Sequence, residues 1–379
     1  MPYTADSGLP WPIKDCSDAG GVIGASDPVA LVQPHGKEVA LRDYADPVHP
    51  RTVCRFSFAA VVQLIDSRHI VVMGTAASSL FAVVDLPEMR HHWFQLRPEG
   101  PRAECTDLLG VSPGLDAVTW RTYNIASGSQ SIHVTTAAGD RVVGTLPSPD
   151  FCGSFPLTPS SAYSPSGQYM FFLDRQAGPS MNSLLVLNGS QVRIKLTPPK
   201  GGWAIGAEPS MPVWSPVTDT LYYEQDGKIW SWTSATGPRT FLPGLAWCYP
   251  TLSADGRYLA YGVLRADGLY QVDLLEMRSG QAPLVVGKGT HNMPAFLNSN
   301  LLWYQTWSYA QCGAGVNASE FPVPNIPPKL TGQPVIYDTT DGSETPSLID
   351  QVFEVWPATG YGYSGAWPPV TVFGGGGTA

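Results

Sequence analysis

The sequence is poor in charge. Only 14% of its 379 residues are Asp, Glu, Lys or Arg, against about 25% in a typical soluble domain. Its 22 basic residues are outnumbered by 31 acidic ones, which gives a formal net charge of −9. This balance argues against a nucleic-acid partner, which is bound through clustered Lys and Arg. Because 43% of the residues are apolar, the chain is also too hydrophobic for intrinsic disorder.

Long hydrophobic runs are missing too. The longest apolar runs, such as residues 80–84, have the length of a strand, far below the ~18 residues of a membrane span. We therefore predict no membrane span. Residues 1–4 lack the basic and apolar regions of a secretory signal, so we expect either a cytosolic chain or one numbered after processing.

What the sequence does have is an internal repeat. Its clearest copy is Pro-Thr-Leu-Ser-Ala-Asp-Gly-Arg-Tyr-Leu-Ala-Tyr-Gly at residues 250–262, and related phrases begin near Ala162 and Pro212. Each copy is a strand-length apolar block interrupted by a polar turn. Six equivalent anchor positions are Leu64, Ser112, Ser164, Ser215, Ser253 and Leu297.

The spacing of these anchors predicts the fold. The intervals of 48, 52, 51, 38 and 44 residues bracket the roughly 40–50 residues of a four-stranded propeller blade. The segments between turns lack the i, i+3, i+4, i+7 pattern of a packed helix. We predict an all-β fold, a six-bladed β-propeller, and seven blades stay open because residues 1–50 have room for a degenerate one. The strand expected at residues 38–42 completes the first or last blade and closes the ring.

The phrase at residues 253–261, followed by a strand that ends in Asp273 and then by a Gly turn, resembles the repeat of TolB-like, WD40-like propellers. The resemblance covers about residues 55–357 and is strongest in the third to fifth repeats. It implies a six- or seven-bladed ring, often secreted or periplasmic, that mostly serves as a binding platform. The same propeller also caps prolyl-oligopeptidase enzymes, but no part of this chain matches their α/β-hydrolase domain.

We accordingly divide the chain into an N-terminal arm (1–50), a propeller (51–357) and a C-terminal arm rich in Gly and aromatic residues (358–379). The C-terminal arm has no blade of its own in which to bury its apolar side chains. An extended strand recovers its backbone hydrogen bonds by joining an exposed sheet edge. We expect this arm to contact another subunit, with its own ring as the alternative, through Tyr361, Tyr363, Trp367, Val370, Val372 and Phe373.

No motif for catalysis, cofactor binding or metal binding is found. The glycines at 374–377 are not followed by Lys-Ser/Thr and a helix, and residues 126–129 do not match Gly-x-Ser-x-Gly. His91 and His92 are adjacent, so on a strand they point to opposite faces. Residues 338–344 hold three carboxylates but lack calcium-loop spacing, so a hairpin is favoured there. We therefore predict no catalytic, cofactor-binding or metal-ligating residues.

Two sets of residues leave alternatives open. Acids near strand ends are interpreted as turn-formers, although the paired acids of a glycosidase meet in space and not in sequence; they are Asp85, Asp174, Asp226 and Asp273. Tryptophans are interpreted as packing between blades, with a sugar-stacking surface as the alternative; they are Trp203, Trp230, Trp232, Trp247, Trp303 and Trp307.

The cysteines favour an oxidising compartment. Their number is even and they contain no Cys-x-x-Cys pair, which is unlike a zinc or redox site and compatible with three disulfides. The repeat register suggests the pairs Cys16 with Cys54, Cys105 with Cys152 and Cys248 with Cys312. Two N-glycosylation acceptors, Asn188 and Asn317, lie among turn residues. We expect an extracellular or periplasmic protein.

The function that we predict from these features is a non-enzymatic binding or self-assembly module. It would form oligomers or filaments through its terminal arms, with a protein partner or further copies of itself and no cofactor. The alternative is a carbohydrate-active or other hydrolytic enzyme with a pocket on the ring axis, where loops of several blades converge.

Overall fold

The computed structural model is all-β. No helix occurs among the residues that it describes, and hence none there that is long and apolar enough to cross a membrane. The described residues are 2–3, 13–16, 23–24, 26–35, 38–57, 62–73, 80–96, 103–124, 127–147, 161–173, 182–186, 191–192, 212–225, 228–242, 247–264, 270–286, 292–305 and 333–356.

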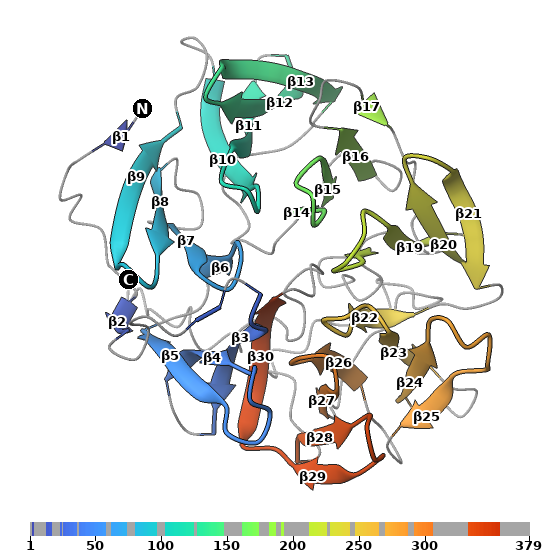
Figure 1. The fold of residues 1–379 in the computed structure, drawn as a ribbon. Coiled ribbons are helices and arrows are strands. Elements are labelled where there is room, and N and C mark those ends of the chain that lie inside the picture. The colour runs from blue at the N-terminus through green and yellow to red at the C-terminus, as the bar shows by residue number, and fades with distance from the viewer. Residues whose placement is uncertain are drawn as a thin grey trace, which may run out of the picture.

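Seven antiparallel sheets surround a common centre, like the blades of a propeller (Figure 1). Blade 1 contains β6 (Val62–Leu64), β7 (His69–Met73), β8 (Leu80–Asp85), β9 (Arg90–Gln95) and, added to β9, β1 (Pro2–Tyr3). Blade 2 contains β10 (Ala103–Val111), β11 (Ala117–Asn124), β12 (Ser129–Thr136) and β13 (Gly139–Pro147). Blade 3 contains β14 (Ser161–Tyr163), β15 (Tyr169–Leu173), β16 (Asn182–Val186) and β17 (Gln191–Val192).

The next three blades are also built from consecutive strands. Blade 4 contains β18 (Val213–Trp214), β19 (Leu221–Gln225), β20 (Lys228–Thr233) and β21 (Gly237–Leu242). Blade 5 contains β22 (Cys248–Leu252), β23 (Tyr258–Leu264), β24 (Tyr270–Glu276) and β25 (Leu284–Val286). Blade 6 contains β26 (Asn292–Phe296), β27 (Leu301–Gln305), β28 (Val335–Asp338) and β29 (Glu344–Pro346).

Blade 7 joins four strands from residues 13–56 to the last described strand. Its strands, in spatial order, are β2 (Ile13–Asp15), β5 (Arg51–Phe56), β4 (Val39–Asp43), β3 (Val29–Pro34) and β30 (Ile349–Trp356). The red β30 therefore lies beside the blue β3 (Figure 1). The strand predicted at residues 38–42 is β4, and it does belong to the sheet that closes the ring.

The six predicted repeats correspond to blades 1 to 6. Each anchor lies at the end of, or directly after, the first strand of one blade, as Ser253 does after β22. Blade 7 has no anchor of its own because its strands come from the two ends of the repeat region. It is the degenerate blade for which residues 1–50 left room, so the structure has seven sheets.

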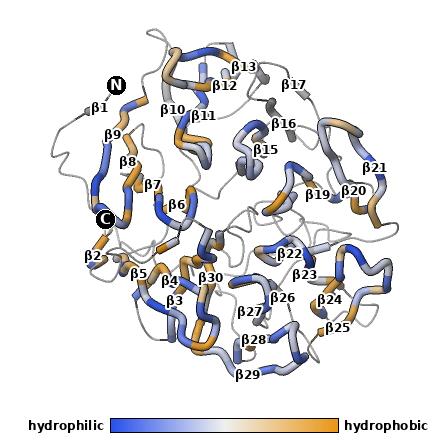
Figure 2. Tube along the Cα trace, viewed as in Figure 1, coloured by the Kyte–Doolittle hydropathy of each residue, from blue (hydrophilic) through white to orange (hydrophobic). Residues whose placement is uncertain are grey.

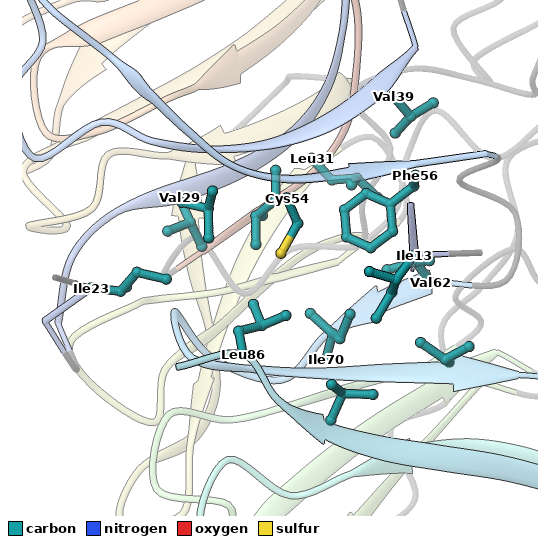
Figure 3. Packing of buried hydrophobic residues seen from close by; sticks show 14 of the residues in the cluster. Ile13, Ile23, Val29, Leu31, Val39, Cys54, Phe56, Val62, Ile70 and Leu86 are labelled. Carbon is teal, nitrogen blue, oxygen red and sulfur yellow. The ribbon is translucent and has the colours of Figure 1, made fainter. Parts of the chain in front are cut away.

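Buried hydrophobic side chains pack between neighbouring blades. Hydrophobic stretches recur around the ring (Figure 2). Between blades 7 and 1, Leu31 and Phe56 pack in one cluster with Val62 and Ile70 (Figure 3). Similar clusters join blades 1 and 2, 2 and 3, 4 and 5, 5 and 6, and 6 and 7. Aromatic rings join blades 3 and 4, as in the contact of Tyr169 with Trp214. The ring is therefore closed.

The repeated phrase forms the turn between the first two strands of a blade. In blade 5, Ser253 Oγ accepts a hydrogen bond from the Tyr258 N–H at 2.9 Å and donates one to Asp255 at 2.7 Å. Gly256 has a φ of 68°, and a Cβ there would come within 2.9 Å of Val217 in blade 4. The glycine is required both by its backbone conformation and by the close approach of the neighbouring turn.

Candidate functional site

Blade 2 contains a polar network in which a carboxylate, an imidazole and a hydroxyl follow one another, as they do in a catalytic triad. His133 Nδ1 lies 2.8 Å from Asp140 Oδ2, and His133 Nε2 lies 3.2 Å from Thr122 Oγ1. The Trp120 ring stacks on the imidazole with centroids 4.0 Å apart. Trp120 Nε1 donates to Thr135 Oγ1 at 2.8 Å, and Thr135 Oγ1 donates to Asp140 Oδ1 at 2.7 Å. Every member of the network is hydrogen-bonded to another member.

The burial of His133 and Thr122 distinguishes a structural role for this network from a catalytic one. His133 is 0% exposed and Thr122 is 7% exposed, so a substrate does not reach the hydroxyl. Trp120 stands opposite His133 across β11 and β12, and Thr135 stands opposite Asp140 across β12 and β13. The network thus connects three strands of one blade, and its role is structural. No sequence motif marks these residues, and the only signal was the alternation of polar residues on these strands.

A second polar cluster lies in the gap between blades 4 and 5, and we call it the 4/5 cluster. It consists of Glu224 on β19, Trp247 just before β22, Tyr261 on β23, and Gln271 and Asp273 on β24. Trp247 and Tyr261 belong to the hydrophobic core of this gap. The Trp247 backbone N–H donates to Glu224 Oε2 at 3.3 Å. Blades 4 and 5 are therefore connected through the Glu224 carboxylate.

Strand alternation places both acids of the cluster on this gap. Tyr222 packs against the core between blades 4 and 5, and Glu224, two residues further along β19, points to the same face. Asp273 stands directly opposite Tyr261 in the register of β23 and β24, so it shares the face of Tyr261. Interpreting Asp273 as a turn-former was wrong, because it lies within β24 and faces a neighbouring blade.

The electrostatics of the 4/5 cluster differ from those of a salt-bridged site. Burial raises the pKa of the Glu224 carboxyl to about 7, against a smaller lowering by the Trp247 N–H. Burial also raises the pKa of Asp273, although Gln271 Nε2 donates to Asp273 Oδ1 at 2.7 Å. Within the described part of the chain, neither acid has an ion-pair partner. Both carboxyls therefore hold a proton more tightly than an exposed acid does.

Two buried polar atoms complete the cluster. Trp247 Nε1 and the Tyr261 hydroxyl find no hydrogen-bond partner among the described residues. Their rings lie 6.1 Å apart, centroid to centroid. Burial and the nearby Asp273 carboxylate both raise the pKa of Tyr261. This gap is thus the one place where raised carboxyl pKa values and unpaired donors are brought together in the described structure.

The structure also places other residues that the sequence singled out. Asp85 accepts the Glu88 N–H at 3.2 Å and so forms a turn, as predicted. The residues at 338–344 form a hairpin, in which the Gly342 N–H donates to the Asp338 carbonyl at 2.8 Å. His91 and His92 are exposed on successive positions of β9, and no group of three metal-ligating side chains occurs among the described residues.

The tryptophans that the structure describes pack between strands and blades. Trp232, Trp247 and Trp303 are buried, and Trp303 Nε1 donates to the Ile349 carbonyl at 3.1 Å. Trp230 is partly buried. Packing, rather than a sugar-stacking surface, accounts for the three buried rings. Asp174, Asp226, Trp203 and Trp307 lie outside the described residues.

A disulfide joins Cys16 to Cys54, the first of the three pairings predicted from sequence. It fastens the end of β2 to β5 at the outer side of blade 7. The side chains of the other four cysteines lie outside the described part of the structure, as do Asn188, Asn317 and the C-terminal arm.

The repeated turn and the closed ring of sheets decide the type of fold. It is a β-propeller with seven sheets. TolB from Acinetobacter baumannii is 14% identical, with a TM-score of 0.37 over 86% of this chain and 80% of that one. A putative 6-phosphogluconolactonase from Bacteroides uniformis is 12% identical, with a TM-score of 0.44 over 87% and 99% of the two chains. A prolyl endopeptidase is 12% identical, with a TM-score of 0.46 over 85% of this chain and 50% of that one.

These similarities are similarities of fold alone. No protein-family model matches the sequence of this propeller, and no curated protein matches it either.

Proposed function

We propose that this propeller is a non-enzymatic, extracytoplasmic binding module that assembles with copies of itself through its C-terminal arm. The observation that carries the proposal is strand addition at the outer edges of two blades. β2 pairs with β5 at the edge of blade 7, and β1 pairs with β9 at the edge of blade 1. N-terminal segments of this chain thus already use blade edges as binding surfaces.

The disulfide supports the compartment. Cys16 and Cys54 fasten the added β2 strand to the blade that receives it. Disulfides of this kind persist in oxidising compartments and are rare in the cytosol. An extracellular or periplasmic location is the compartment that fits this bond.

The sequence of the C-terminal arm favours a further strand. Residues 370–373 are Val-Thr-Val-Phe, between two prolines and a run of glycines, and such residues favour a strand. A strand given by one subunit to the edge of the next makes a head-to-tail contact, which propagates into a fibre unless its rotation closes a ring. The proposal therefore extends to oligomers or filaments.

Deletion of residues 358–379 tests this assembly role. The mass of the full-length and shortened chains in solution is measured by light scattering over a range of concentrations, and both are viewed by electron microscopy. We expect the full-length chain to form oligomers or filaments and the shortened chain to be monomeric with an unchanged circular dichroism spectrum. Equal masses for the two chains at every concentration would reject the role of the arm.

A second candidate function is hydrolysis, and the 4/5 cluster is the observation that favours it. A carboxyl with a pKa near neutral is what a general acid requires, and burial raises the pKa of Glu224 to about 7. The test is a panel of polysaccharides offered to the wild type, to Glu224→Gln and to Asp273→Asn, with Glu88→Gln as the control at an exposed acid. Activity that Glu224→Gln abolishes and Glu88→Gln retains would support this candidate.

A further inference from the structure

The outer edges of the seven blades are not protected in the same way. In blades 1 and 7, β1 and β2 pair with part of the outer strand. The outermost strands of the other blades are β13, β17, β21, β25 and β29, and no described strand pairs with their outer sides. An uncovered edge strand exposes unpaired N–H and C=O groups, which other chains join unless charge, proline or shortness prevents it.

Four of these five edge strands carry such protection. β13 contains Asp140 and Arg141, β21 contains Pro238 and Arg239, and β29 contains Glu344 and Pro346. β17 has only two residues. Each of these edges is therefore charged, interrupted by proline or too short to receive a strand well.

The three residues of β25 include neither a charged residue nor a proline. Its sequence is Leu-Val-Val, and it lies at the outer side of blade 5 (Figure 1). Leu284 is 56% exposed and Val285 is 50% exposed, whereas Val286 is buried in the core between blades 5 and 6. Successive side chains of a strand alternate in direction, so apolar surface is presented on both sides of this edge.

The C-terminal arm matches this edge in charge and composition. Residues 357–379 contain no Asp, Glu, Lys or Arg, so pairing with β25 buries no charge. The 13 residues between Trp356 and Val370 span at most about 45 Å when extended. That length allows residues 370–373 to leave one ring and reach a neighbouring ring.

We propose that β25 is the acceptor edge for the C-terminal arm of a second copy of this chain. Residues 370–373 of the second copy add a fifth strand to blade 5, and Val370 or Phe373 packs against the exposed Leu284 and Val285. This inference builds on the assembly role proposed above and names the surface that receives the arm. It makes the contact heterologous, because the arm of one copy and the blade of another are different surfaces.

The test compares two outer-strand valines of similar exposure. Val285→Lys places a charge on β25, and Val142→Lys places the same charge on β13, where Val142 is 48% exposed. We expect Val285→Lys to weaken self-association at least about tenfold, since an edge lysine opposes strand addition. Val142→Lys should associate like the wild type, and both variants should keep the wild-type circular dichroism spectrum.

A mixing experiment tests the arm and the acceptor edge independently. The chain shortened by residues 358–379 keeps the acceptor edge, and full-length Val285→Lys keeps the arm. Each should be monomeric alone, and the mixture should give a one-to-one complex that grows no further. Hydrogen exchange at residues 284–286 of the shortened chain should slow on mixing.

The outcomes distinguish this inference from the assembly role. If shortening the chain abolishes association while Val285→Lys associates like the wild type, the assembly role stands and β25 is not the acceptor. If shortening leaves the mass unchanged, the assembly role fails. If the full-length chain is monomeric and shortening it speeds exchange at residues 284–286, the arm covers its own ring, which overturns the second copy as occupant.

Discussion

Blade 2 and the gap between blades 4 and 5 both bury polar side chains, but the two sets differ in how fully they are hydrogen-bonded. In blade 2, His133 is hydrogen-bonded through both ring nitrogens, to Asp140 and Thr122. In the 4/5 cluster, Glu224 accepts a backbone N–H, whereas the Tyr261 hydroxyl finds no partner within the described chain. The polar groups of the blade 2 network find their hydrogen-bond partners within one blade. The 4/5 cluster joins two blades, and only some of its polar groups have partners.

This difference predicts which cluster stabilises the fold. A buried network that satisfies its members rigidifies the sheet that contains it, so its loss should lower stability. A cluster that leaves polar atoms unpaired costs stability, so its loss should not. Substitutions that remove one member from each cluster therefore test the distinction directly.

The largest effect is expected at His133. Replacing it by Leu removes two hydrogen bonds and the stacking contact with Trp120, and it leaves Thr122 and Asp140 Oδ2 without the imidazole. We expect His133→Leu to lower the free energy of unfolding by about 2–4 kcal/mol, measured by denaturant titration. The control is His92→Leu on the exposed face of β9, for which a change within about 0.5 kcal/mol is expected. Equal effects of the two substitutions would contradict a structural role for the blade 2 network.

The next effect concerns the dependence of stability on pH. Burial raises the pKa of Glu224 from 4.5 to about 7, so the folded state binds this proton more tightly than the unfolded state does. The stability that the proton contributes is full below pH 4.5 and is lost as the pH rises to about 7. Glu224→Gln should therefore be more stable than the wild type by roughly 1–3 kcal/mol at pH 8 and close to it at pH 4.5.

His69 makes a separate control necessary. Its hydrogen bond to Asp66 raises the His69 pKa, so the wild type also loses stability as the pH rises above the ordinary histidine value of 6.5. That loss should remain in Glu224→Gln and disappear in His69→Asn. If the two variants follow the same pH profile between pH 4.5 and 6, the assignment of the lower range to Glu224 is wrong.

The propeller fold was predictable from the sequence because its signals are local. A turn such as residues 253–256 is determined by consecutive residues, and it recurs at blade-length intervals. Blade 7 was harder to predict, since β30 pairs with β3 across most of the chain length. The Cys16–Cys54 pair could be predicted because both cysteines lie beside the same end of the repeat region.

The polar clusters were not predictable for the opposite reason. His133 meets Asp140 and Thr122 only through the registers of three strands, in which a shift by one residue would turn each side chain to the other face. Glu224 and Asp273 belong to different blades, and neighbouring blades meet through side-chain packing that no turn motif encodes. Sequence spacing alone suggested a turn for Asp273, whereas register places it opposite Tyr261.

A smaller effect in blade 2 is expected at Thr122. Thr122→Val keeps the shape of the side chain and removes the hydroxyl that lies 3.2 Å from His133 Nε2. The buried imidazole nitrogen then has no partner, which costs about 1–2 kcal/mol. Denaturant unfolding of Thr122→Val and His133→Leu, alone and combined, measures their coupling. Additive losses would show that the two residues do not act as one network.

The smallest effect is expected at Tyr261, and it completes the comparison with Thr122. Tyr261→Phe removes a buried hydroxyl that has no hydrogen-bond partner in the described structure, and it keeps the ring that packs against Trp247. Because no hydrogen bond is lost and an unpaired polar atom is removed, the free energy of unfolding should stay the same or rise by up to about 1 kcal/mol. The measurement is denaturant unfolding beside Thr122→Val under the same conditions, since both substitutions delete one buried hydroxyl. A loss as large as that of Thr122→Val would mean that the Tyr261 hydroxyl is bonded in solution, and the contrast between the two clusters would then fail.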